Sequence, residues 1–138
     1  MMKELTVEAT LENLTTVQTF VERELEENDC PMKAIMQISI AVEEIYVNIV
    51  HYAYNPAVGA ATVRCEVGGE PVRVTIQFMD SGKPFDPLAQ SDTDTTLSAE
   101  EREMGGLGIL MVKKSMDQVE YAYEHGKNIL TICKALNR

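Results

Sequence analysis

The stretch AVEEIYVNIVHYAY, residues 41–54, decides the fold because it combines an apolar stripe with polar side chains at its border. It continues a segment that begins at Pro31, a residue suited to the first position of a helix. The pattern predicts a long buried helix that ends at Asn55 and Pro56, since proline disfavours helical backbone in the residue before it. Its expected buried face carries Ile35, Ile38, Val42, Ile45, Ile49 and Tyr52.

The segments on both sides of this helix predict a strand, a second helix and a hairpin. Residues 3–11 alternate apolar and polar side chains, as a half-buried strand does, and residues 13–28 have the period of an amphipathic helix capped by its first asparagine. ATVRCEV and VRVTIQFMD, residues 61–67 and 72–80, alternate around two glycines, which predicts an antiparallel hairpin.

A second hairpin is expected at the end of the chain. Residues 118–124 and 128–136 alternate in the same way, and Gly126 and Asn128 are expected to supply the positive φ angles of the turn between them. The element order predicts an α+β two-layer sandwich, in which helices cover one face of a mixed, mostly antiparallel sheet. The length of 138 residues predicts one domain.

Composition narrows the range of partners and compartments. The chain has 12 basic and 22 acidic residues, a net charge of −10, so binding to nucleic acid or to an anionic membrane is disfavoured. Its three cysteines lie far apart without metal-ligand spacing, which fits a reducing compartment, and no signal peptide is evident at the first residues. We expect a cytoplasmic protein whose eight methionines fill its core.

Three polar motifs are candidates for chemistry. Glu44 and Asn48 lie four residues apart on the predicted long helix, with His51 about one turn further on, so the three share one edge. Asp80 and Gly82 directly follow an apolar strand. Each motif also has a structural interpretation: a polar helix flank for the first, and for the second a turn that Asp80 caps and in which Gly82 takes a positive φ.

The third motif follows a long polar connection. Gly105, Gly106 and Gly108 precede a predicted short helix that begins close to Gly106, so free N–H groups and the positive helix end could face an anion together. Glycines there could also serve loop flexibility alone. The segment is not a phosphate-binding loop of the Walker type, because no Gly-Lys-Ser or Gly-Lys-Thr follows.

Read in order, the motifs resemble those of the GHKL ATPase fold, shared by gyrase, histidine kinases and MutL repair proteins, and the likeness spans nearly the whole chain. Residues 41–54, MDSGKPFDP (79–87) and GGLGILMVKKSMDQVEY (105–121) are most similar to the anti-sigma-factor serine/threonine kinases. The resemblance implies a Bergerat-type ATP-binding domain over residues 1–138. It also implies ATP and Mg²⁺ as cofactors.

The resemblance implies a role for each matching residue. Glu44 becomes the general base, Asn48 the Mg²⁺ ligand, and Asp80 the partner of the adenine amine. Residues 86–104 become a lid over the nucleotide. The nucleotide-binding residues it implies are Asn48, His51, Asp80, Gly82, Arg102, Gly105, Gly106, Leu107 and Gly108.

The implied function is that of an anti-sigma regulatory protein with ATP-dependent kinase activity. Its implied partners are a sigma factor and an anti-sigma-factor antagonist, and a homodimer is compatible with it. Glu103 and Met104 stand where active kinases of this branch tend to carry a basic lid residue, so Arg102 is the nearest cation. The alternative is a non-catalytic module whose sigma-factor affinity is switched by nucleotide. A histidine-kinase catalytic domain is disfavoured because neither histidine is a convincing phosphoacceptor.

Overall fold

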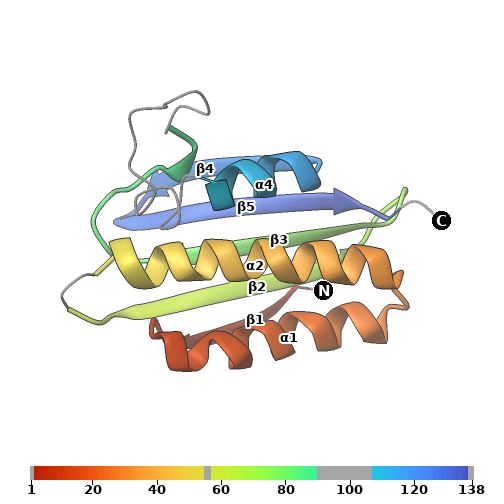
Figure 1. Cartoon of the computed structure of the whole chain (residues 1–138), viewed down its shortest axis with the longest axis horizontal. Helices are drawn as coiled ribbons and strands as arrows, with labels where there is room; N and C mark the ends of the chain where they lie inside the picture. The colour runs from red at the N-terminus through yellow and green to blue at the C-terminus, as the bar shows by residue number, and fades with distance from the viewer. Residues whose placement is uncertain (1, 55–56, 90–106, 137–138) are drawn as a thin grey trace.

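The computed structural model describes residues 2–54, 57–89 and 107–136, which form two layers (Figure 1). Five strands make one sheet in the order β1-β2-β3-β5-β4, and every neighbouring pair is antiparallel. The helices lie on one face of this sheet. The elements are β1 (Lys3–Glu8), α1 (Leu14–Glu27), α2 (Met32–Tyr52), β2 (Ala60–Gly68), β3 (Arg73–Asp80), α4 (Leu107–Ser115), β4 (Gln118–Glu124) and β5 (Lys127–Ala135), with short 3₁₀ turns at Leu11–Asn13 and Pro87–Ala89.

The predicted α+β sandwich and both predicted hairpins are confirmed. Helix α2 crosses the sheet between α1 and α4 and contacts both helices. Its predicted apolar face is buried from Ile35 to Ile49, with Tyr52 half-buried at its end. Strands β2, β3 and β5 bury alternate side chains against this helix layer, so the core lies between the helices and the centre of the sheet.

The predicted turn of the second hairpin is wrong in one residue. His125 and Gly126 carry the positive φ angles, 54° and 76°, and Glu124 pairs directly with Lys127. This leaves a two-residue turn. Asn128 is already part of β5, where its side chain is buried opposite Asp80.

The expectation that the methionines fill the core is also wrong for several of them. Met116 is buried, but Met32, Met36 and Met111 are 69%, 59% and 53% exposed. On α2 the reason is position, since Met32 is the first residue of the helix and Met36 lies roughly 160° around the helix from Ile38. The core consists mainly of aliphatic side chains, with Tyr46, Phe78 and Met116 among its larger members.

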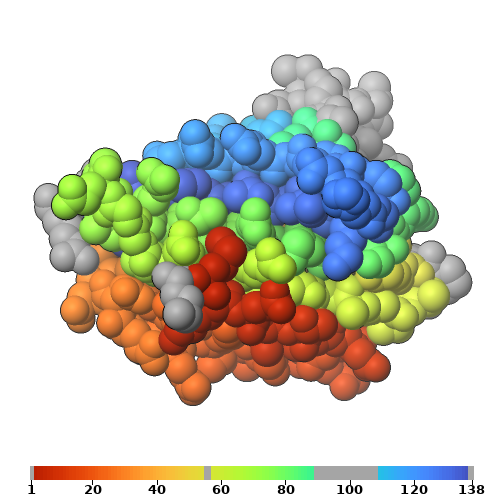
Figure 2. Space-filling model, turned by 180° about the vertical axis from the view of Figure 1, so that it is seen from behind, coloured from red at the N-terminus to blue at the C-terminus, as the bar shows by residue number. Residues whose placement is uncertain are grey.

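The second face of the sheet carries no helix among the described elements, and Figure 2 shows strands at the surface there. Its side chains include charged ones, such as Arg64 and Glu4, which form an ion pair at 2.6 Å, and uncharged ones, such as Thr6 and Thr62, whose hydroxyls are 2.9 Å apart. No described helix is long and apolar enough to cross a membrane. The buried polar side chains of Asn48, Asp80 and Asn128 lie on the helix-covered side of the sheet.

Candidate functional site

Buried polar side chains converge on one place in the molecule. Within residues 2–54, 57–89 and 107–136, four polar or charged side chains are buried: Glu24, Asn48, Asp80 and Asn128. All but Glu24 line the same pocket, between the C-terminal half of α2 and the ends of β3, β4 and β5. Because burying polar groups costs free energy unless they are satisfied, such convergence in an apolar pocket is typical of a binding site. The apolar lining consists of Ile45, Ile49, Ala53, Phe78, Phe85, Pro87 and Leu130.

Asp80 ends β3 and projects one carboxylate oxygen toward the protein. Its Oδ1 accepts hydrogen bonds from the Gly82 N–H and the Asn128 Nδ2, both at 2.9 Å. Burial raises the pKa of Asp80, while the hydrogen bonds from Asn128 and Gly82 lower it. Among the described residues none donates a hydrogen bond to Oδ2, which leaves an acceptor for a ligand in the pocket. Asp80 therefore caps its turn with Oδ1, and Oδ2 takes no part in that cap.

Asn128 is the centre of the hydrogen-bond network around Asp80. Besides its bond to Asp80, its Nδ2 donates to the Lys83 carbonyl at 2.9 Å. Its Oδ1 accepts from the Phe85 N–H at 3.1 Å and from the Tyr121 hydroxyl. This side chain ties the loop after β3 to the two C-terminal strands.

Gly82 is required by the approach of the protein's own backbone. A Cβ there would lie 2.2 Å from the Ala53 carbonyl oxygen, far inside contact distance. The same carbonyl accepts from the Lys83 N–H at 3.2 Å, and the Tyr54 hydroxyl accepts from the Ser81 N–H at 2.7 Å. The end of α2 is thus fixed to the loop that carries Asp80. Positive φ plays no part, since it occurs at Gly69 and Gly126 among the described glycines.

Two aromatic rings stack on each other beside the pocket. Tyr52, at the end of α2, stacks on Phe85 with ring centroids 5.2 Å apart. Phe85 also lines the pocket, whose volume of about 40 Å³ is enough for water molecules. A ligand that enters this pocket would therefore contact Phe85.

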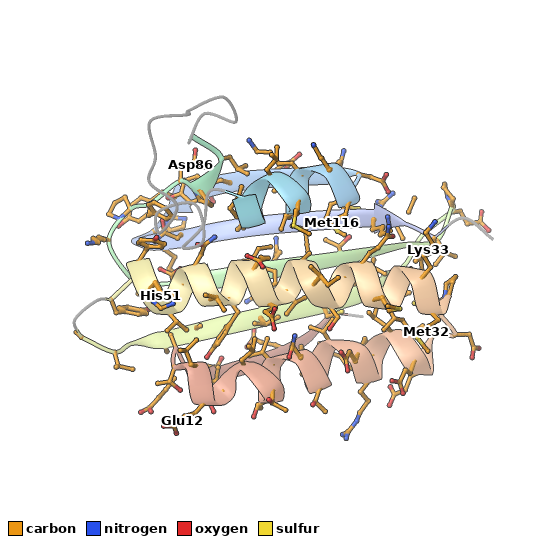
Figure 3. The ribbon with its side chains drawn as sticks, in the orientation of Figure 1. Glu12, Met32, Lys33, His51, Asp86 and Met116 are labelled. Carbon is orange, nitrogen blue, oxygen red and sulfur yellow. The ribbon has the colours of Figure 1, made fainter. Side chains whose placement is uncertain are left out.

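The three residues predicted to share one edge of the long helix have different surroundings in the structure. Asn48 is buried, lines the pocket and makes no hydrogen bond with another described residue. Glu44 is half-buried, and burial together with the nearby Glu43 raises the pKa of its carboxyl. The His51 ring packs edge to face against the Tyr52 ring, with the ring centroids 6.4 Å apart, and His51 does not line the pocket. Figure 3 places His51 and Asp86 at the same end of the molecule, with Met32 and Lys33 at the other.

The remaining predicted residues belong to the third motif. Arg102, Gly105 and Gly106, with most of the predicted lid, lie outside the described residues. Leu107 and Gly108 open α4, which confirms the predicted helix start. The structure thus brings Asn48, Asp80 and Gly82 together, and their assigned roles stay predictions.

Sequence reasoning missed Asn128, Tyr121 and Phe85 as parts of this site. Phe85 lies within the MDSGKPFDP motif, residues 79–87, so its closeness to Asp80 could have been predicted from the sequence. Tyr121 and Asn128 are distant in the chain, and only the pairing of β3 with β5 and of β5 with β4 brings them to Asp80.

Comparison with known families agrees with this geometry. A family model described as the histidine kinase-like ATPase domain matches residues 7–134. The chain belongs to this family. An ATPase domain implies a nucleotide-binding site, and the matched range contains every residue that lines the pocket.

Relatives within the histidine kinase-like ATPase family cover most of the chain. The anti-sigma F factors of Thermoanaerobacter sp. (strain X514) and Caldanaerobacter subterraneus subsp. tengcongensis are 25% and 26% identical to it over 129 residues, which is 94% of this chain and 89% of each relative.

Two solved structures share the fold. The RsbU and RsbW domains of Rv1364c from Mycobacterium tuberculosis match all of this chain and 33% of that chain, with a TM-score of 0.71 and 19% identity. The SiaB–SiaC complex from Pseudomonas aeruginosa matches 94% of this chain and 88% of that chain, with a TM-score of 0.58 and 13% identity. At these identities the two structures establish the fold alone.

Proposed function

We propose that this chain is an ATP-dependent anti-sigma regulatory protein that binds a sigma factor and phosphorylates a serine or threonine of an antagonist protein. The observation that carries the proposal is the convergence of Asn48, Asp80 and Asn128 on one apolar pocket in a histidine kinase-like ATPase domain. The regulatory part is supported by the relatives, which are named anti-sigma F factors.

In this proposal the adenine base occupies the pocket between α2 and the sheet. Asp80 Oδ2 accepts a hydrogen bond from the exocyclic amine, because Oδ1 is already occupied by Gly82 and Asn128. The apolar side chains of Ile49 and Phe78 supply contacts to the ring faces. The same acceptor opposes guanine, which presents a carbonyl at the corresponding position.

The phosphates lie along α2 toward Glu44. The buried amide oxygen of Asn48 fits Mg²⁺, which takes oxygen ligands and keeps several waters, and whose chemistry is to neutralise phosphate charge. Glu44, one turn away, accepts the proton of the attacking hydroxyl. Its raised pKa suits a carboxylate that exchanges protons. The N-terminus of α4 contributes backbone N–H groups to the phosphates.

A non-catalytic module is the second candidate. Its support is Glu103 and Met104, acidic and neutral residues directly before the glycines, where a cation would stabilise the terminal phosphate. In this case ATP and ADP change only the affinity for the sigma factor.

One experiment separates the two. Purified chain is incubated with Mg²⁺, γ-labelled ATP and the antagonist encoded beside it, while sigma-factor binding is followed by size-exclusion chromatography, which also reports a homodimer. Label on a serine or threonine of the antagonist supports the kinase. Nucleotide-dependent sigma binding without label supports the module. Absence of both sigma binding and ATP binding contradicts the proposed function.

A further inference from the structure

Asn128 uses every hydrogen-bonding position of its side chain. A carboxamide has two N–H donors and an oxygen that accepts two bonds. The donors go to Asp80 Oδ1 and the Lys83 carbonyl, and the oxygen accepts from Phe85 and Tyr121. The side chain is only 6% exposed. Buried polar side chains are generally hydrogen-bonded, and Asn128 meets this requirement with four bonds that all lie around Asp80 and the loop after it.

The partners of Asn128 fix which way its amide points. The Lys83 carbonyl can only accept and the Phe85 N–H can only donate, so the nitrogen and the oxygen cannot exchange places. The nitrogen must therefore face Asp80, and the Asp80 oxygen beside it must act as an acceptor. With the Gly82 N–H on the same oxygen, only the second carboxylate oxygen remains for a ligand.

The Asn128 side chain also positions the Phe85 ring at the pocket. The bonds to Lys83 and Phe85 hold the loop after Asp80 against the start of β5. In this arrangement Phe85 lines the pocket and stacks on Tyr52. Asn128 is thus connected both to the polar group that would select a base and to a ring that bounds the space for it.

We infer that Asn128 is a positioning residue that sets the base selectivity of the nucleotide pocket, by holding Asp80 as an acceptor and the Lys83–Phe85 loop in place. This inference rests on the proposed adenine-nucleotide site. It assigns the selectivity to a residue of β5 that acts through Asp80 and need not touch the reacting phosphates.

Two variants remove different parts of the network. Asn128→Leu keeps the approximate size of the side chain and removes all four hydrogen bonds. Asn128→Asp keeps the acceptor for Phe85 and Tyr121 but loses both donors and places a second carboxyl beside Asp80. Thr131→Val is the matched control, because Thr131 lies on the same strand, loses only the hydrogen bond from Gln77 and does not line the pocket.

The measurement is the dissociation constant for ATP and for inosine triphosphate, which carries a carbonyl in place of the adenine amine. Wild type and Thr131→Val are expected to prefer ATP. Both Asn128 variants are expected to lose ATP affinity by roughly tenfold or more. Their preference for ATP over inosine triphosphate should fall with it, because Asp80 is no longer held as an acceptor. Circular dichroism and thermal unfolding check folding, with Asn128→Ser as a milder variant should Asn128→Leu not fold.

The outcomes separate this inference from the proposed function. If folded Asn128 variants keep the wild-type preference, or lose affinity for both nucleotides equally, the residue is structural only and the inference is wrong while ATP binding stands. If wild type binds neither nucleotide, the proposed function fails and the inference fails with it.

Discussion

Glu44 and Asn48 lie one helical turn apart on α2, yet Asn48 is buried in the pocket lining whereas Glu44 is half-buried and outside it. The two polar residues therefore have different surroundings despite their shared edge. In the proposed site this separates binding of the nucleotide from proton acceptance.

Replacement of Glu44 by glutamine is expected to abolish most phosphate transfer while Mg-ATP binding persists. Glutamine keeps the shape but cannot accept the proton, so the rate should fall on the order of 10²- to 10⁴-fold. The check is transfer of labelled phosphate to the antagonist beside a calorimetric titration with Mg-ATP. Glu43→Gln, at an exposed position on the same helix, is the control and should stay active. Transfer by Glu44→Gln at the wild-type rate would reduce Glu44 to a flank residue.

The same substitution is expected to change the pH dependence of stability. Burial raises the pKa of Glu44 above its ordinary value of 4.5, so the folded state binds this proton more tightly than the unfolded state. The stabilisation that the bound proton provides is fully present below pH 4.5, and it is lost as the pH rises through the raised pKa of the folded state. At neutral pH Glu44→Gln should be at least as stable as wild type, with the difference shrinking below 4.5. Urea unfolding at both pH values measures it, and a lower stability of the variant at neutral pH would contradict the prediction.

Asn48→Ala is expected to lose the Mg²⁺-dependent part of ATP affinity, by roughly tenfold or more, since a lost ligand typically costs that much or more in metal affinity. Titrations with ATP in the presence of Mg²⁺ and in EDTA provide the comparison. Gln37→Ala, at a half-buried position of α2 away from the pocket lining, is the control. Undiminished Mg-ATP binding by Asn48→Ala would show that Asn48 is not a Mg²⁺ ligand.

Asp80→Asn is expected to weaken ATP and to spare GTP. The substituted amide oxygen can still accept from Gly82 and Asn128, so the amide nitrogen must face the pocket. That nitrogen opposes the amine of adenine and suits the carbonyl of guanine. Competition binding with both nucleotides tests the reversal. Equal affinity of wild type for ATP and GTP would argue against Asp80 as the base-recognition residue.

Phe85→Trp is expected to report base binding by fluorescence. The chain contains no tryptophan, so the new indole is the only one. Since Phe85 lines the pocket and stacks on Tyr52, entry of a base should change the surroundings and emission of residue 85. ATP should change the emission and inorganic triphosphate should not. A response to both would place the change at the phosphates instead of the base.

The fold was predictable because its signals are local. The apolar period of residues 35–49 is read directly from the sequence, and the structure buries that face. The alternation in both hairpins is equally local. Local patterns also place Asn48, Asp80 and Gly82 on the correct helix and turn.

Asn128 shows where local patterns stop. A glycine two residues before an asparagine is a good turn signal, and it led to the wrong assignment because His125 takes the first positive φ. The partner of Asn128 is Asp80, distant in sequence, and that pairing depends on the register of β3 against β5. Met32 and Met36 were misassigned for a related reason: an apolar residue type does not indicate which helix face it occupies.

The packing of Gly82 on Ala53 affects how such motifs can be used to recognise active relatives. A side chain at position 82 would have to displace the helix-end carbonyl, so glycine is required for folding whether or not a nucleotide binds. A homologue that had lost ATP would still keep this glycine, and its Asp-x-Gly signature would survive as a folding constraint. The presence of that signature therefore discriminates poorly between working enzymes and inactive descendants, and Glu44 and Asn48 are the positions at which loss of activity should first become visible.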